Sequence, residues 1–226
     1  MERTVEVHAY HGWGMHGDFW APLTEVLPDH VFLKPADHGY FGGEFEPEFS
    51  EEVESKVLFL HSYGVHWCPI EKLEEADTIV ILNGFDSFHP LSNPAKSRSR
   101  KILKGMQAGF KDNPDKVLEA FYRNCFGGNE FRMPDLSWKN RSLLSKDLAA
   151  LHKTKLKLNK RTIANWIIID SSSDKIVPGA RGVELVSLTG SDKYYSVKGG
   201  DHAFPASNPQ ECAMILSKAL PIFEAK

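Results

Sequence analysis

Short apolar runs, each bounded by glycine, proline or polar residues, recur near both ends of the chain. The runs at residues 56–60 and 78–82 are almost continuously apolar, which is typical of strands in a parallel sheet covered on both faces. Residues 5–10 alternate between apolar and polar positions instead and run into a glycine-rich loop. The pattern predicts strands at residues 5–10, 31–33, 56–60, 78–82, 164–169 and 193–197.

Apolar residues recur at helical spacing between the predicted strands. A first helix is expected to begin near Asp18, with Asp18 as its N-cap. A second helix is expected at residues 63–75 and a last one at about residues 209–223. From about residue 85 to residue 160 helical spacing dominates, and no strand is expected there.

Strand and helix therefore alternate on both sides of one helical block, which predicts an α/β fold. The expected core, residues 1–84 and 162–226, contains a mostly parallel sheet, and a helical cap, residues 85–161, is inserted into it. The chain of 226 residues, 42% of them hydrophobic, is long enough for one domain with such an insertion.

Composition predicts a monomeric protein of the cytoplasm. No apolar run approaches the roughly 20 residues that cross a membrane, and no signal-peptide core follows Met1. The three cysteines lack the CxxC spacing of metal or redox sites, so we expect free thiols in a reducing compartment.

Charge is unevenly distributed, although the net charge is only −3. Residues 86–161 contain 17 Lys or Arg and 7 Asp or Glu, a balance of +10, and the remainder is acidic. This asymmetry predicts either a basic module with an acidic partner or a solvated, lysine-rich helical surface. The basic block lacks the motifs of common RNA- and DNA-binding domains, so no nucleic-acid partner is expected.

Candidate chemistry is concentrated in loops that directly follow predicted strands. Ser62 lies between a buried strand and a predicted helix, where a strand–turn–helix corner exposes a nucleophile. Asp174 is the expected orienting acid, with Asp170 as the alternative, and His202 is the expected general base. Asp201, beside it, is expected to face solvent and is a weaker candidate for the acid.

Two backbone amides are candidates for an oxyanion hole. Tyr63 follows the nucleophile, and Trp13 lies in the His-Gly-Trp-Gly loop, where glycines allow close approach of the backbone to a ligand. Leu60 and Val65 stand where the nucleophile turn favours glycine, which is expected to open the turn slightly. No histidine has metal-ligand spacing, so neither a metal nor another cofactor is expected.

The chain order of Ser62, Asp174 and His202 is that of α/β-hydrolases. The sequence resembles in particular the pimeloyl-acyl carrier protein methyl ester carboxylesterases of biotin synthesis. The similarity lies in residues 11–14 with Trp20, in Asp37 with residues 39–42, in the three loops of the predicted triad, and in the segments 102–110 and 117–121. A helix that usually follows the Asp37 loop is expected to be lost or very short.

The resemblance implies a serine carboxylesterase that hydrolyses the methyl ester of pimeloyl-acyl carrier protein, with Trp13 and Tyr63 as oxyanion donors. A general carboxylesterase or thioesterase for small acyl substrates, or a non-catalytic binding protein of the same fold, are the alternatives. The implied acyl channel contains Trp13, Trp67, Phe110 and Phe121, although ordinary core packing explains these residues equally well. The implied contacts with the acidic carrier protein are Lys104, Lys111, Lys116, Arg123, Lys139 and Arg141.

Overall fold

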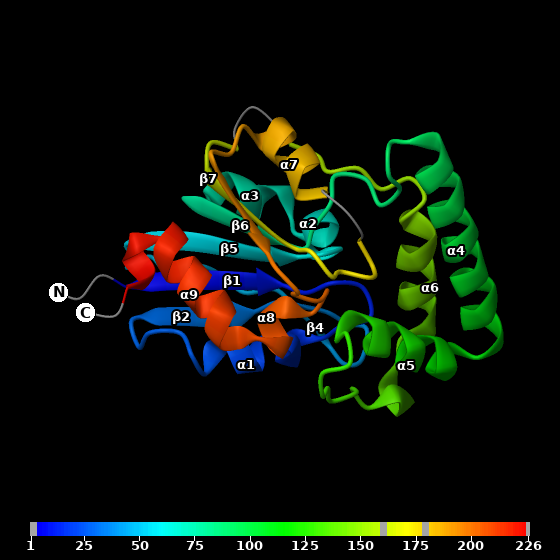
Figure 1. Cartoon of the computed structure of the whole chain (residues 1–226). Helices are drawn as coiled ribbons and strands as arrows, with labels where there is room; N and C mark the ends of the chain where they lie inside the picture. Colours follow the sequence, from blue (N-terminus) through cyan, green and yellow to red (C-terminus); the bar gives the residue numbers. More distant parts are fainter. Residues whose placement is uncertain (1–3, 159–161, 178–180, 225–226) are drawn as a thin grey trace.

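The computed structural model describes residues 4–158, 162–177 and 181–224. Six strands, each parallel to its neighbours, form a sheet in the order β2-β1-β5-β6-β7-β8 (Figure 1). All six predicted strands are present, and the predicted α/β class is confirmed. The strands are β1 (Val5–Tyr10), β2 (Val31–Pro35), β5 (Ser55–His61), β6 (Thr78–Leu82), β7 (Asn165–Ser171) and β8 (Lys193–Val197).

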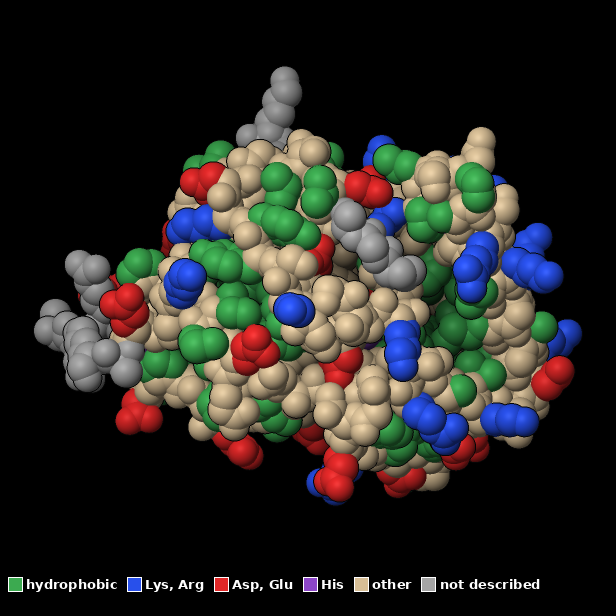
Figure 2. All heavy atoms as spheres, in the orientation of Figure 1, with side chains coloured by type: hydrophobic (Ala, Val, Ile, Leu, Met, Phe, Trp, Pro, Cys, Tyr) green, Lys and Arg blue, Asp and Glu red, His purple; other side chains and the backbone are tan. Residues whose placement is uncertain are grey.

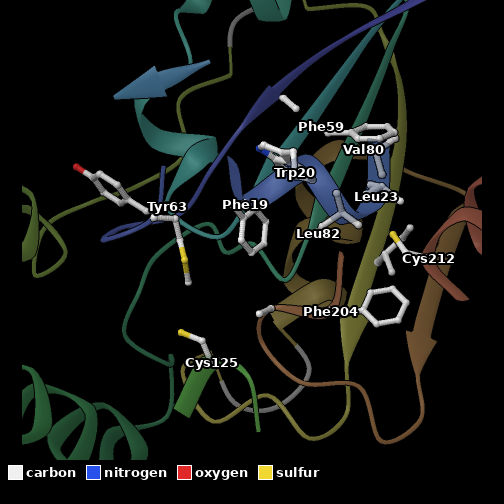
Figure 3. Packing of buried hydrophobic residues seen from close by; sticks show 14 of the residues in the cluster. Phe19, Trp20, Leu23, Phe59, Tyr63, Val80, Leu82, Cys125, Phe204 and Cys212 are labelled. Carbon is white, nitrogen blue, oxygen red and sulfur yellow. The ribbon is translucent and has the colours of Figure 1, made fainter. Parts of the chain in front are cut away.

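Helices cover both faces of the sheet because its strands are apolar on both sides. In β6, Ile79 and Ile81 belong to one buried cluster and Val80 and Leu82 to the other, as the two-residue period of a strand requires. The first face is covered by α2 (Gly64–Trp67), α3 (Ile70–Glu75) and α7 (Arg181–Thr189). The second, seen in Figure 3, is covered by η1 (Gly17–Trp20), α1 (Ala21–Thr24), α8 (Phe204–Ser207), α9 (Pro209–Ala219) and η3 (Pro221–Phe223).

The strand order reverses direction at β1, and this creates a switch point at the carboxyl ends of β1 and β5. The chain passes from β1 outward to β2 and then returns to the other side of β1 as β5. Loops that leave β1 and β5 at their carboxyl ends therefore diverge, and open α/β sheets bind ligands at such a point. The glycine-rich loop at residues 11–14 and the serine at position 62 both lie there.

Three helices and a short 3-10 turn lie between β6 and β7, beyond the carboxyl ends of the strands (Figure 1). They are α4 (Asn93–Asp112), α5 (Pro114–Cys125), η2 (Leu136–Trp138) and α6 (Arg141–Ala150). Within the described residues 85–158 no strand occurs, in agreement with the helical spacing. We call residues 85–158 the cap segment. Its buried residues, including Phe110, Leu118 and Leu144, belong to the same hydrophobic cluster as the second face of the sheet.

An extended segment replaces a helix beside β1. Residues 46–54 contain no helix and lie against the polar side of β1, where Glu6 and His8 are buried. The Ser50 hydroxyl donates to Glu6 Oε2 at 2.7 Å, and the Phe49 ring stacks on the His8 ring at 3.6 Å. This segment connects β5 to a small hairpin formed by β3 (Asp37–His38) and β4 (Glu44–Phe45), which the sequence did not predict.

Several predicted helices are shorter than expected. The predicted helix at residues 63–75 is broken between α2 and α3, because Pro69 lacks an N–H and Cys68 before it is extended, with ψ 126°. Asp18 is not an N-cap: it lies inside η1, which His16 caps, and a single turn of α-helix follows. The last helix ends at Ala219, before the proline at position 221. Helix α7 had no counterpart among the predicted elements.

Candidate active site

Ser62 lies at a tight corner directly after β5. Its backbone is left-handed, with φ 53°, and its N–H donates to the Leu82 carbonyl oxygen at 3.1 Å. A Cβ at Gly64 would lie 2.3 Å from the Tyr10 carbonyl oxygen, so only glycine fits there. Leu60 and the valine at position 65 point into the core beneath the corner, where their bulk is accommodated.

The structure brings together the three predicted triad residues. His202 Nε2 lies 3.0 Å from Ser62 Oγ, and His202 Nδ1 lies 2.7 Å from Asp174 Oδ2. The other carboxylate oxygen of Asp174 accepts from the backbone N–H groups of Ile176 and Val177 at 2.7 and 2.8 Å. A carboxylate accepts the Nδ1 proton of the imidazole, which leaves Nε2 free to accept the serine proton. Pro178, the last residue of this loop motif, lies outside the described residues.

Two residues for which the sequence predicted no supporting role hold the backbone of the histidine. The carbonyl oxygen of His202 accepts from His61 Nε2 at 2.8 Å and from Asn83 Nδ2 at 2.9 Å. Burial lowers the pKa of His61 well below its usual value, so its ring is neutral and carries the single proton on Nε2. His61 ends β5 and Asn83 follows β6 directly, and this position at strand ends was the available signal.

The expectation that Asp201 faces solvent was wrong. Asp201 is buried, and its carboxylate accepts from Asn129 Nδ2 at 2.9 Å and from Ser207 Oγ at 2.7 Å. Two residues after Asp201, the backbone N–H of Ala203 donates to the Cys125 carbonyl oxygen at 3.0 Å. The loop of the histidine is therefore tied directly to the end of α5 in the cap segment.

The alternative acid, Asp170, has a different partner. Its Oδ2 accepts from the Tyr194 hydroxyl at 2.7 Å. Among the described residues, the carboxylate that contacts the ring of His202 is that of Asp174 alone. The geometry therefore favours Asp174 over Asp170 as the orienting acid.

The amides of Trp13 and Tyr63 are available to a ligand. In the described part of the chain neither backbone N–H donates to a protein acceptor. The loop that contains Trp13 lies against the nucleophile, because a Cβ at Gly12 would be 3.0 Å from Ser62 Cβ. Two free donors thus adjoin the serine, as stabilisation of an oxyanion requires.

The aromatic residues predicted to form an acyl channel are packed against other side chains. The Trp13 ring meets Phe121 edge-on at 5.0 Å and Phe110 at 5.9 Å, and Trp67 stacks on His38 at 4.5 Å. A cavity of about 510 Å³ lies instead between η1, α1 and the chain that follows α5, and none of these four aromatic residues lines it. Its apolar walls include Met15, Phe19, Phe41, Tyr122, Phe126 and Phe131.

Basic side chains gather over the cap helices, on the right of Figure 2. Lys104, Lys111, Lys116 and Arg123 are exposed on α4 and α5. Two further predicted carrier contacts have internal partners. Lys139 pairs with Asp115 at 2.9 Å, and Arg141 donates to the Lys111 carbonyl oxygen at 3.3 Å.

Other classes of site find little support in the described residues. Within them, no group of three His, Cys, Asp or Glu side chains is arranged to hold a metal ion. No helix among the described segments has both the length and the apolar character to span a bilayer. Cys68, Cys125 and Cys212 are buried and unpaired with one another.

No protein-family model matches the chain, and a search of curated proteins finds no relative. Solved structures do resemble it. An esterase from Exiguobacterium antarcticum superposes with a TM-score of 0.70 at 11% identity, covering 99% of this chain and 94% of that one. The chain has the α/β-hydrolase fold. A thermophilic esterase from Thermogutta terrifontis matches this hydrolase fold with a TM-score of 0.65 at 14% identity, over 99% of this chain and 92% of that one. A bromoperoxidase from Bacillus anthracis matches it with a TM-score of 0.64 at 16% identity, over 97% of this chain and 91% of that one.

Proposed function

We propose that this protein is a serine hydrolase of carboxylic esters. The observation that carries the proposal is the continuous hydrogen-bonded chain from Ser62 through His202 to Asp174, beside two amides that lack a protein acceptor. Several structures with the same fold are described as esterases, which supports the same chemistry here.

The geometry supports an acyl-enzyme mechanism. His202 Nε2 takes the Ser62 proton as Oγ attacks the ester carbonyl, and Asp174 stabilises the imidazolium that forms. The carbonyl oxygen becomes an oxyanion that accepts from the amides of Trp13 and Tyr63. His202 then protonates the departing alcohol, and water releases the acid by the same steps in reverse order. No cofactor is required.

We propose the methyl ester of pimeloyl-acyl carrier protein as the substrate. Exposed basic residues on α4 and α5 fit an acidic carrier, whose approach they would accelerate electrostatically. Large apolar side chains are also exposed on the cap segment: Leu91 at 72%, Ile102 at 63% and Trp138 at 74%. Such residues are common where proteins dock. The cavity of about 510 Å³ is large enough for an acyl chain, and we propose it as the acyl site although neither the triad nor the two amide-bearing residues line it.

A general esterase for small acyl substrates is the second candidate. It uses the same triad and the same amides, and it is favoured by the fact that structures of similar fold are esterases. It requires no basic surface, so its kinetics would not depend on salt. In either case we propose that the chain works in the reducing cytoplasm, since its three cysteines are buried and unpaired with one another. We also propose that it is a monomer.

The first experiment is hydrolysis of pimeloyl-carrier-protein methyl ester by the wild type and by Ser62→Ala, at 20 mM and 300 mM salt. We expect the variant to lose at least about 10³-fold in kcat, because the nucleophile is removed. The wild-type kcat/KM should fall at high salt. Lys104→Glu/Lys111→Glu should lower kcat/KM, whereas Lys218→Glu, an exposed residue on α9, should leave it unchanged.

The outcomes separate the candidates. Failure of a fluorophosphonate to label Ser62 in the wild type would exclude a serine hydrolase and favour a binding protein. Cleavage of short p-nitrophenyl esters without cleavage of the carrier-bound ester would keep the chemistry and exclude the proposed substrate.

A further inference from the structure

Both residues that supply the free amides reach the cap segment with their side chains. The Trp13 indole N–H donates to the carbonyl oxygen of Leu144 in α6 at 2.9 Å. In Figure 3 the ring of Tyr63 points away from the other labelled side chains. Burial, and then the carboxylate of Asp147 beside the Tyr63 hydroxyl, raise the pKa of Tyr63. Trp13 and Tyr63 also belong to the buried hydrophobic cluster that contains Leu144 and Leu148 of α6. The two amide-bearing residues and this helix are therefore packed into one core.

The two contact points on α6 lie one helical turn apart. Leu144 and Asp147 are both buried and share one face of the helix, as residues three apart do. Asp147 Oδ2 also accepts from the Tyr40 hydroxyl at 2.8 Å and from His38 Nε2 at 2.9 Å. This carboxylate is therefore a shared acceptor for side chains of the core.

A second connection leads from Asp147 to the loop that contains Trp13. The backbone N–H of His38 donates to His11 Nε2 at 3.1 Å, and the His38 ring stacks on Trp67. The indole N–H of Trp67 donates to the carbonyl oxygen of His11 at 2.8 Å. His11 is separated from Trp13 by one glycine, so this network fixes the start of the loop as well.

We propose that Asp147 is a positioning residue that holds the amides of Trp13 and Tyr63 in place for the oxyanion. The inference rests on the proposed esterase function. It makes α6 part of the catalytic framework, although Asp147 itself does not contact the reacting atoms. Because the amides stabilise charge that develops in the transition state, their displacement lowers kcat and leaves KM nearly unchanged.

The test compares Asp147→Ala, Asp147→Asn and the matched control Lys146→Ala, an exposed neighbour on α6. With p-nitrophenyl acetate, kcat of Asp147→Ala should fall roughly 10- to 100-fold, part of the loss seen when an oxyanion donor is removed. Asp147→Asn, which keeps an acceptor oxygen, should lose less, and Lys146→Ala should match the wild type. A short alkylboronic acid, which forms a tetrahedral adduct on serine, should bind Asp147→Ala more weakly by a similar factor.

Thermal unfolding of each variant shows whether it is folded. Unchanged kcat and boronic acid affinity in folded Asp147→Ala, or a loss confined to KM, would overturn the inference. If Asp147→Ala does not fold, Asp147→Asn decides by the same two measurements. Failure of the esterase proposal is distinct, because the wild type itself would then show no Ser62-dependent hydrolysis.

Discussion

At the residue scale, the left-handed backbone of Ser62 exposes a nucleophile at the carboxyl end of an interior strand, β5. A side chain at φ 53° is strained, and such conformations cost about 1–3 kcal/mol. Packing beneath the corner and the bond from Ser62 N–H to the Leu82 carbonyl oxygen hold it in place. Asn83, which supports His202, has a similar backbone with φ 49°. Two adjacent strands are therefore each followed by a left-handed residue that serves the site.

Gly64→Ala should disrupt this corner. Its Cβ would lie 2.3 Å from the Tyr10 carbonyl oxygen, and backbone cannot yield as a side chain can. We expect a loss of about 1–3 kcal/mol in the free energy of unfolding and most of the esterase activity. Gly105→Ala is the control, since its Cβ meets nothing within 4 Å in α4, and it should stabilise by about 0.5–1 kcal/mol. Urea unfolding checks both, and equal stability of the two variants would contradict the prediction.

The triad was predictable from sequence because its members follow strands, whereas the burial of Asp201 and Asp147 was not. Asp201 and Asp147 are buried because distant polar groups, among them Asn129 and Tyr40, satisfy them. Asn129 and Tyr40 are far in sequence from the aspartates they contact, so no local pattern predicts these pairs. A single acidic residue in a polar stretch therefore looks solvent-exposed until the tertiary structure pairs it.

At the element scale, strands were predicted better than helices for a physical reason. A run such as residues 78–82 has to be buried on both faces, and few other structures suit it. The described helices outside the cap segment have 11 residues or fewer, and proline or the surrounding packing decides where they end. Helix α7 was missed, and the predicted helix at residues 63–75 proved to be two helices. The cap helices α4 and α5 were identified because their apolar faces repeat over several turns.

The walls of the cavity predict an effect on chain length. Ala21, the first residue of α1, lines the cavity, so Ala21→Phe should fill part of it. We expect kcat/KM for p-nitrophenyl octanoate to fall about 10-fold, with that for the acetate unchanged, because only a long chain needs this space. Thr24→Phe, exposed on the same helix and outside the cavity lining, is the control. An equal loss for both esters would show that the cavity is not the acyl site.

At the scale of the whole molecule, the cap and the sheet share one hydrophobic core. Side chains such as Phe110 and Leu148 of the cap belong to the same cluster as Val80 and Ile167 of the sheet. Opening the cap as a rigid lid would expose this cluster to water, at about 25 cal/mol for each Å² of apolar surface. This cost opposes opening of the cap, which is consistent with α6 acting as a framework for the site.

Stability should fall as the pH is lowered from 7.5 to 5.0. Burial lowers the pKa of His66 to about 3, and burial together with His152 lowers that of His89 to about 4. Unfolded histidine titrates near 6.5, so below that pH the unfolded chain binds protons that the native chain does not, and unfolding becomes easier.

For His66 alone the loss should be on the order of 1–2 kcal/mol. Glu46 and Glu184, whose pKa values are raised by burial, act in the opposite direction. Urea midpoints at the two pH values provide the measurement. A midpoint at pH 5.0 equal to or above that at pH 7.5 would contradict the prediction.

The insertion of the cap between β6 and β7 also sets the order in which the site is assembled. Strand β6 ends at Leu82 and β7 begins at Asn165, so pairing of these strands closes a long loop. The helices within that loop form from local contacts and fold fast, and by doing so they draw its ends together. Asp174 and His202 follow this loop in the chain, so Ser62 is synthesised long before either of them. Until β7 and β8 have joined the sheet, Ser62 therefore lacks its general base and its orienting acid. The serine becomes a nucleophile only when these last strands are in place.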